Sequence, residues 1–149
     1  MAVVDISVGT NLSGVAASAA VAGHGGELSV LRMTVDFAAH PLVAANQLKL
    51  WSLPAGKLPV KTKAKITGAS LVAGATIDIG TYASSNDAAI DADCLANEVV
   101  ITSLGEKVAQ APLAAAGSAV PFWIGICQGA GGGEASFNSG VLELEVTVI

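Results

Sequence analysis

The strongest constraint in this sequence is a repeated alternation of apolar and polar residues with a period of two. In segment 142–148, leucine and valine occupy the even positions, whereas glutamate and threonine occupy the odd positions. Successive side chains of a β-strand point to opposite faces of a sheet, so this pattern predicts a strand with one buried and one exposed face. The same alternation occurs in segments 31–37, 47–53, 57–66 and 75–80.

Two of these segments carry specific expectations about which side chains are exposed. In segment 47–53 the alternation turns Leu48 and Leu50 toward the core and Trp51 toward the polar side. The next alternating segment places Leu58 on the core side. Its polar side is expected to carry a row of lysines, which comprises Lys57, Lys61, Lys63 and Lys65.

The remaining segments favour an all-β fold. The β-branched run at 98–104 and the continuous apolar run at 120–127 predict strands, the second covered on both faces. Segment 84–97 is expected to be a loop, 109–119 a loop or a single helical turn, and the glycines of 129–133 a hairpin tip. Short strands punctuated by Gly and Pro, without helical periodicity, predict a β-sandwich of jelly-roll type or a small barrel.

The first 28 residues differ from the rest in composition. Residues 9–28 are rich in Gly, Ala and Ser without periodicity, which is typical of a linker. We therefore divide the chain into an N-terminal arm, residues 1–28, and a sandwich domain, residues 29–149. Within the arm, Val4, Ile6 and Val8 alternate with polar residues. Such a short strand either adds to the sheet edge of another chain or folds back as an edge strand of its own domain.

Composition excludes several classes of protein. Hydrophobic residues make up 52% of the chain and charged residues only 13%, so the chain as a whole is not intrinsically disordered. A net charge of −5 argues against nucleic acid as a partner. The sequence contains no apolar run long enough to span a membrane. We expect the apolar excess to be buried against copies of the chain or against a partner protein.

The N-terminal segment also argues against export. It contains Asp5 and no basic residue before Arg32, whereas a signal peptide starts with a positively charged region. We therefore expect the chain to be made in the cytoplasm of its host without a signal peptide.

The sequence contains no constellation typical of an enzyme or a cofactor site. Only His24 and His40 are available as a general base, one within a glycine-rich linker and the other before a proline. Neither a nucleophile elbow nor a phosphate-binding glycine motif occurs. Cys94 and Cys127 are 33 positions apart, and we expect both to be reduced and buried, with a disulfide or metal ligation as the alternative. We expect a protein without enzymatic activity and without a cofactor.

A weak candidate for a metal site lies in the acidic segment that follows the fourth alternating strand. Asp87, Asp91 and Asp93 place three carboxylates within seven residues, and Ca²⁺ prefers clustered oxygen ligands. The spacing lacks the central glycine and terminal glutamate of an EF-hand loop. A solvated loop with Asx turns is therefore the favoured interpretation, and no metal is assigned.

The lysine row permits three interpretations. Its residues and the outward pair Glu143 and Glu145 could be neighbours in one sheet, where opposite charges contribute about 0.2–1 kcal/mol per pair. The lysines could instead guard a sheet edge against aggregation or contact an acidic partner. Trp123 is expected in the core, whereas an exposed tryptophan can anchor an interface. The candidate contact residues are Val4, Ile6, Val8, Trp51, Lys61, Lys63 and Lys65.

Residues 34–97 resemble a known family. They contain V-D-F at 35–37, L-K-L-W-S-L-P-A-G at 48–56, an alternating strand, A-T-I-D-I-G at 75–80 and an Asp-rich segment at 85–95. This order resembles small virion structural proteins of tailed bacteriophages, of the head decoration or capsid cement type.

The resemblance implies a β-sandwich module on the outer surface of the capsid that binds the major capsid protein shell and stabilises the head. It also implies an oligomer, commonly a homotrimer. The alternative is an adhesion module of a phage tail or fibre that binds a host receptor or glycan through Trp51, Tyr82 and the aspartates of the acidic segment.

Overall fold

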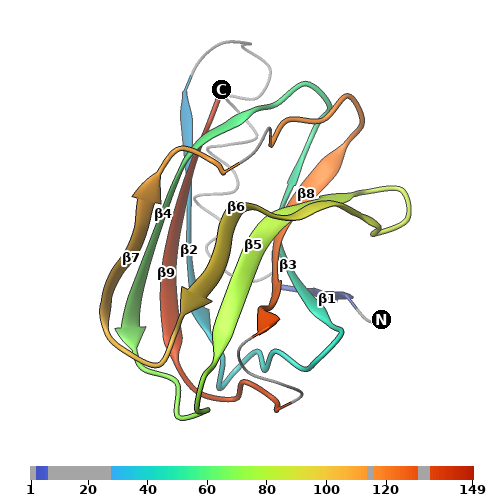
Figure 1. The fold of residues 1–149 in the computed structure, drawn as a ribbon. Coiled ribbons are helices and arrows are strands. Elements are labelled where there is room, and N and C mark those ends of the chain that lie inside the picture. Colours follow the sequence, from blue (N-terminus) through green and yellow to red (C-terminus); the bar gives the residue numbers. More distant parts are fainter. Residues whose placement is uncertain (1–2, 7–27, 114–115, 131–134) are drawn as a thin grey trace.

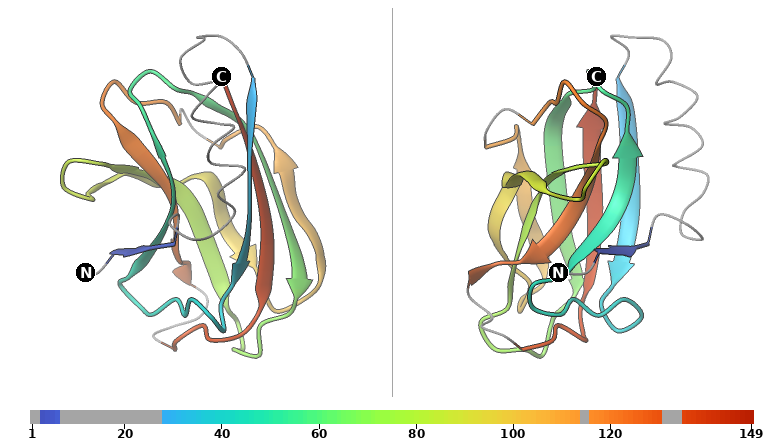
Figure 2. Two further views of the ribbon diagram at one scale, coloured as in Figure 1. Left: turned by 180° about the vertical axis from the view of Figure 1, so that it is seen from behind. Right: turned by 90° about the vertical axis from the view of Figure 1, so that its right-hand side faces the viewer.

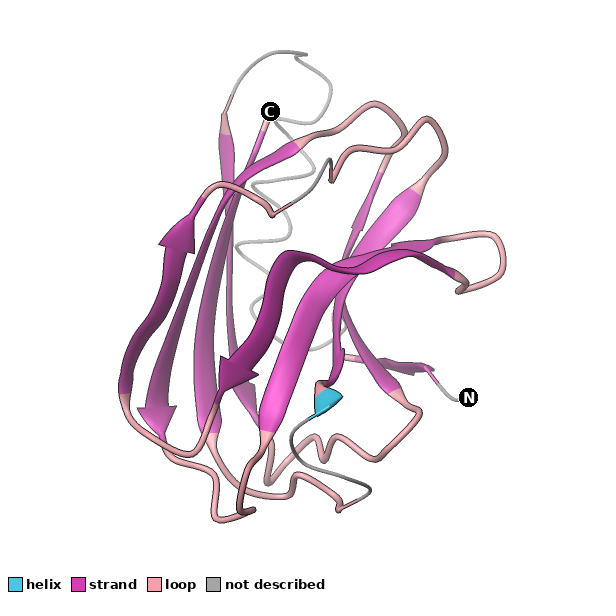
Figure 3. Cartoon of the chain, in the orientation of Figure 1, coloured by secondary structure: helices cyan, strands magenta, loops and turns pink. Residues whose placement is uncertain are grey.

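The computed structural model of the chain describes residues 3–6, 28–113, 116–130 and 135–149. Within these residues the chain forms nine strands and is dominated by β-structure (Figures 1 and 3). Their bounds are β1 Val3–Asp5, β2 Ser29–Asp36, β3 Gln47–Leu53, β4 Pro59–Gly68, β5 Thr76–Ala83, β6 Ala89–Val100, β7 Gly105–Gln110, β8 Phe122–Gln128 and β9 Val141–Val148.

The strands form two sheets that face each other, as the views in Figures 1 and 2 show. One sheet has the order β1-β3-β8-β5-β6 and the other the order β2-β9-β4-β7. All pairings are antiparallel except that between β1 and β3, which is parallel. From β2 onward, the two strand orders are those of a jelly roll. The all-β prediction and the sandwich are therefore confirmed, and the alternative of a small barrel is wrong.

The main core lies between the two sheets and follows the alternation in the sequence. The even positions of β9 are buried, whereas its odd positions are exposed or half-buried. In β2 the odd positions from Leu31 to Val35 are buried. Strand β8 has its first five residues fully covered on both faces, as its continuous apolar sequence predicts. Burial of these apolar faces, at about 25 cal/mol per Å², is the main source of stability.

Trp51 is buried, and the prediction that it lies on the polar side is wrong. The pairing of β3 with β8 shifts between Lys49 and Trp51, so Leu50 is an extra residue in the ladder. A β-bulge of this kind inverts the alternation beyond it. Trp51 therefore pairs with Ile124 and joins the main core, where only 3% of its surface is exposed.

A second register shift changes which lysines belong to the exposed row. The pairing of β4 with β9 shifts between Pro59 and Lys61, so the alternation before the shift is inverted. Leu58 is consequently exposed and Lys57 is 92% buried, both opposite to the prediction. Lys61, Lys63 and Lys65 are exposed as predicted. Lys57 does not belong to their row.

Two segments of the chain between β5 and β8 differ from expectation. Most of the predicted loop at 84–97 belongs to β6, which begins at Ala89 after a short turn. Its pairing with β5 shifts register three times, so its sequence shows no simple alternation. β7 was not predicted. The first two residues of segment 109–119, which was expected to be a loop or a single helical turn, belong to this strand. Part of the predicted hairpin tip, 131–134, lies outside the described residues.

The sheet β1-β3-β8-β5-β6 carries a second buried layer on its outer face. Tyr82 and Trp123 pair across β5 and β8, and their rings stack with centroids 4.2 Å apart. Both residues are buried but lie outside the main core cluster. The start of β6 covers this face, because a Cβ atom at Gly80 would lie 2.2 Å from the carbonyl carbon of Ala92. The expectation that Trp123 is buried is confirmed, although in this outer layer.

Gly125 makes room for the indole ring of this layer. A Cβ atom at Gly125 would lie 2.2 Å from Cζ3 of Trp123 and 2.8 Å from the carbonyl oxygen of Leu48. Because the second contact is with backbone, rotation of the indole alone cannot remove the clash. Only glycine therefore fits this position of β8.

We expect Gly125→Ala to lower the free energy of unfolding by about 1–3 kcal/mol, the usual cost of overpacking. The matched control is Ser52→Ala, because Ser52 is exposed and pairs with Trp123 on the same face. The control should change stability by less than about 0.5 kcal/mol. Urea denaturation followed by tryptophan fluorescence measures both. Equal stability of Gly125→Ala and the native protein would show that the stack does not depend on this glycine.

Candidate functional site

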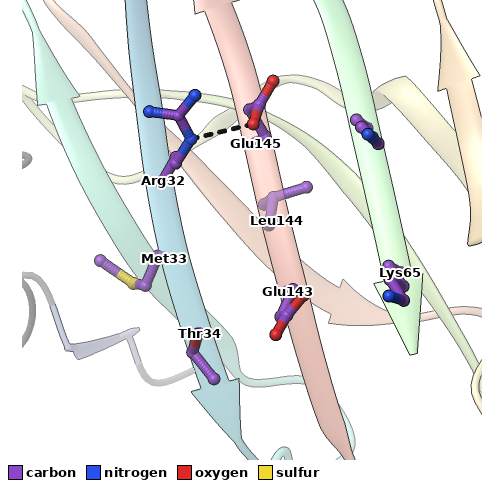
Figure 4. Close-up of a pocket in the computed structure, with 8 residues that line it drawn as sticks. Arg32, Met33, Thr34, Lys65, Glu143, Leu144 and Glu145 are labelled. Carbon is purple, nitrogen blue, oxygen red and sulfur yellow. Dashed lines mark hydrogen bonds and ion pairs between the residues drawn. The ribbon is translucent and has the colours of Figure 1, made fainter. Parts of the chain in front are cut away.

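The outer face of the sheet β2-β9-β4-β7 carries charges of both signs from neighbouring strands. Arg32 Nε donates to Glu145 Oε2 at 3.0 Å, and Lys63 Nζ lies 3.8 Å from Glu106 Oε2 (Figure 4 shows the first contact). The register places Lys63 opposite Glu145 and Lys65 opposite Glu143. The interpretation of the lysines and glutamates as cross-strand neighbours is therefore confirmed.

The position of β4 decides the second interpretation of the lysine row. β4 lies between β9 and β7, so its lysines do not guard a sheet edge, and that interpretation is wrong. Contact of the row with an acidic partner stays a prediction. Lys61 differs from its neighbours in the row because it is opposite Thr147 rather than a carboxylate.

A surface hollow of about 340 Å³ lies over these charged strands (Figure 4). Cationic and anionic side chains both line it, with Met33 and Leu144 between them. Because the charges largely balance, the hollow offers hydrogen-bonding groups without the field that would select a small anion or cation. Such a surface suits contact with another polypeptide better than the chemistry of a small substrate.

Figure 1 shows the end of the sandwich where β2 begins and β9 ends. Several exposed apolar residues and two lysines lie at this end. Leu58 and Ile149 exchange two backbone hydrogen bonds, which brings the segment before β4 to the end of β9. Gly56 donates to the carbonyl of Ser118, which brings the segment before β8 to the same end. We call this surface the cationic end; its large exposed apolar residues are Leu28, Val30, Leu58, Val120 and Ile149, and its cations are Lys57 and Lys61.

Carboxylates gather on the opposite sheet, around β5 and β6. Asp78 Oδ1 accepts the backbone N–H of Glu98 at 2.8 Å, and the backbone of Glu98 is held at a positive φ of 53°. Glu98 in turn accepts hydrogen bonds from Thr76 Oγ1 at 2.6 Å and from the N–H of Ala130 at 2.7 Å. The sequence does not predict these hydrogen bonds around Glu98, because the residues that form them are far apart along the chain.

Burial raises the pKa of Asp78, and the nearby carboxylates of Glu98 and Asp93 raise it further. The pKa of Asp93 is also raised, chiefly by its hydrogen bond with Asp91. Two neighbouring carboxylates of this kind resist carrying two negative charges at once. The β6 side of the molecule therefore holds acidic groups that a cation would stabilise.

The structure does not assemble the weak metal candidate. Asp87 lies in the turn before β6, and its Oδ1 accepts the indole N–H of Trp123 at 3.0 Å. Asp91 and Asp93 lie on β6 itself. Among the described residues, no three His, Cys, Asp or Glu side chains are grouped so that they could hold a metal ion. Asp87 therefore fixes the outer aromatic layer, a role that its position in the sequence does not reveal.

Both cysteines are free, and Cys94 is buried whereas Cys127 is half-buried. The expectation of a free, buried thiol is confirmed for Cys94, whereas Cys127 is free but only half-buried; the alternative of a disulfide is wrong. Burial raises the pKa of both thiols. Burial also raises the pKa of Tyr82, and contact with the Cys127 thiol adds to the effect. Since the thiolate is the reactive form, the raised pKa makes both thiols weaker nucleophiles than a free cysteine at neutral pH.

The N-terminal strand pairs with its own domain in this structure. β1 runs parallel to β3, and Ile6 donates its N–H to the carbonyl of Lys49 at 3.0 Å. The side chain of Ile6 is buried, and Lys49 Nζ lies 3.8 Å from Asp5 Oδ2. Val4 is partly exposed, and Val8 lies outside the described residues. Addition of this strand to another chain stays a prediction.

The residues on which a glycan-binding site would depend are not accessible. Trp51 has 3% of its surface exposed and Tyr82 has 1%, so neither can stack on a sugar without a rearrangement. His24 lies outside the described residues, and the N–H of His40 donates to the carbonyl of Asp36 within a turn. Among the described residues, no helix is long and apolar enough to cross a membrane.

Two solved structures share this fold. A chain from the capsid of Ralstonia phage GP4 matches with a TM-score of 0.60 and 18% identity, over 83% of this chain and 84% of that chain. A chain from the capsid asymmetric unit of cyanophage Pam1 matches with a TM-score of 0.55 and 16% identity, over 83% of this chain and 85% of that chain. At these identities the likeness establishes the fold alone. No family model and no curated protein sequence matches the chain.

We expect Asp78→Asn to be more stable than the native protein at pH 7. Asparagine keeps the oxygen that accepts the Glu98 N–H but cannot ionise. A carboxyl whose native pKa is raised contributes stability that is fully present below its unfolded pKa, 3.8 here, and is lost as the pH rises through the native value. The advantage of Asp78→Asn should therefore appear at neutral pH and vanish toward pH 3.8.

Thermal unfolding at a series of pH values measures this difference. Asp36→Asn is the matched control, since Asp36 is exposed and its Oδ1 likewise accepts a backbone N–H, that of Ala38 at 2.9 Å. The control should show no gain at pH 7. A loss of stability in Asp78→Asn at pH 7 would mean that the hydrogen bond to Glu98 needs the charged acceptor.

Proposed function

We propose that this chain is a non-enzymatic structural protein of a phage virion, of the decoration or cement type. In this proposal it sits on the outer surface of the head as a homotrimer and binds the shell of the major capsid protein. The observation that carries the proposal is the shared jelly-roll fold, which extends over 83% of the chain in chains from two phage capsids.

The chemistry of the described residues supports a structural role. Most charged groups on the outer face of the sheet β2-β9-β4-β7 are matched by groups of opposite sign on the next strand. The thiols and the Tyr82 hydroxyl are held in their neutral forms by burial. These groups stabilise the protein and are poorly suited to attack a substrate or to transfer a proton.

Such a protein would reinforce a shell by adding many modest contacts. A standard protein interface buries about 1,600 Å², and a capsid offers the same site in many symmetric copies. A trimer that touches several capsomers at once binds more tightly than one subunit, because the later contacts form within a single complex. The two-sheet sandwich suits this role, because it is a rigid body with broad faces and two loop-bearing ends.

We expect the purified protein to co-sediment with phage heads that lack it and not with isolated tails. Sedimentation through a density gradient, followed by quantification of the bound chain, measures the partition. Binding should saturate at a fixed ratio to the major capsid protein, because the sites repeat with the shell. Co-sedimentation with tails but not with heads would contradict the decoration role.

The N-terminal arm provides a second test. In this proposal β1 exchanges its place beside β3 for the sheet edge of a neighbouring capsid subunit, so deletion of residues 1–12 is expected to lower the occupancy of heads. Asp5→Asn is the control, since it removes the ion pair with Lys49 and keeps β1. Occupancy is measured by the same co-sedimentation. Unchanged occupancy of the deletion variant would show that the arm has no part in binding.

A further inference from the structure

Two surfaces of this molecule carry opposite charges that form no ion pair within the described residues. We propose that the cationic end of one copy packs against Asp91 and Asp93 on β6 of a second copy. In the proposed homotrimer this contact is head-to-tail and repeats around a ring of three subunits. The inference rests on the proposed homotrimer and names the residues that hold it together.

Lys57 and Lys61 are the unmatched cations. The other lysines of β4 face carboxylates on β9 or β7, whereas Lys61 faces Thr147. Lys57 is 92% buried, which is rare for a lysine without a partner. Among the described residues, no carboxylate side chain lies within ion-pair distance of either ammonium group. Lys61 is exposed, so a carboxylate of a second copy can reach it, whereas Lys57 lies largely beneath the surface at the same end.

Exposed apolar side chains surround these cations. Leu58 directly precedes β4 and Ile149 directly follows β9, and the two residues lie side by side. Their exposed fractions are 42% and 36%. Val30 pairs with Thr147, the same residue that faces Lys61, so it lies in the adjacent row. An apolar patch that surrounds a few polar groups is typical of a protein interface.

Asp91 and Asp93 form an acidic strip on β6, and its charge is opposite to that of the cationic end. The N–H of Asp93 donates to Asp91 Oδ1 at 3.4 Å, and the two carboxyl groups interact directly. Within the described part of the chain, no basic side chain pairs with either of them. Ile90 is the preceding neighbour on the strand, and 42% of its surface is exposed. Leu113 lies beside the strip, because its N–H donates to the carbonyl of Cys94. Its side chain is also exposed, with an exposed fraction of 54%.

A second copy of the chain is the occupant that the charges favour. One molecule supplies both halves of the contact, a cationic apolar end and an acidic apolar strip, on different elements. In a two-fold dimer the same two surfaces would meet reciprocally across one axis, whereas the proposed homotrimer needs a contact that repeats head to tail. Contact between two different surfaces instead repeats around the assembly, and it closes into a ring when the rotation permits. Charge complementarity of this kind selects the partner and its register.

Charge exchange tests the contact. Lys61→Glu and Asp93→Lys should each weaken the oligomer, raising its dissociation constant by about tenfold or more, because each opposes like charges. The double variant Lys61→Glu/Asp93→Lys should regain the native assembly, because the attraction is restored with reversed sign. Sedimentation velocity and light scattering measure the mass across a range of protein concentrations. Circular dichroism confirms that each variant is folded.

Lys107→Glu is the control for the single charge reversals. Lys107 is on the same sheet and is half-buried, and its Nζ donates to Ser103 Oγ within its own strand connection. This variant should assemble like the native protein. A native protein that stays monomeric would overturn the inference. Oligomers that are unaffected by the single reversals, or a folded double variant that fails to reassemble, would overturn it as well.

Co-sedimentation with heads separates this inference from the proposed function. A native protein that forms the charge-dependent ring but ignores heads supports the contact and contradicts the decoration role. A protein that binds heads while its mass is insensitive to Lys61 and Asp93 supports the decoration role and contradicts the contact.

Discussion

The burial of two apolar sheet faces against each other is the interaction on which the rest of this structure depends. Each strand must keep its apolar side chains on the inner face, and the pleat allows this only at every second residue. The inner positions of β2, β4 and β9 meet this requirement with large aliphatic side chains or with Thr62 and Ala64. The outer positions of the same strands are free to carry charge, and these positions form the lysine and glutamate rows.

The sequence predicts this inner and outer division wherever a strand pairs without interruption. It predicts β2 and β9 correctly along their full alternating segments, because their mutual register is continuous. It fails at Trp51 and Lys57, where one extra residue shifts the register and inverts the alternation. A bulge depends on the partner strand, which lies far away in the sequence. The alternation of a single segment therefore cannot reveal it.

The outer aromatic layer could not be predicted for a similar reason. Tyr82, Trp123 and Asp87 come from three separate parts of the chain, and only the pairing of β5 with β8 brings the rings together. Gly80 and Gly125 leave space above the sheet that β6 and the indole ring fill. The low content of aromatic residues, 4%, is therefore concentrated where burial is deep. This arrangement leaves none of these rings free for a ligand.

The distribution of charge separates the groups that stabilise the fold from those available for contact. Across β2, β9, β4 and β7 the opposite charges alternate within one sheet, so they contribute to stability and leave little net field. At the cationic end and along β6 the charged side chains of the described residues are of one sign, and exposed apolar side chains lie near them. Their placement beside apolar surface favours protein contact as their role.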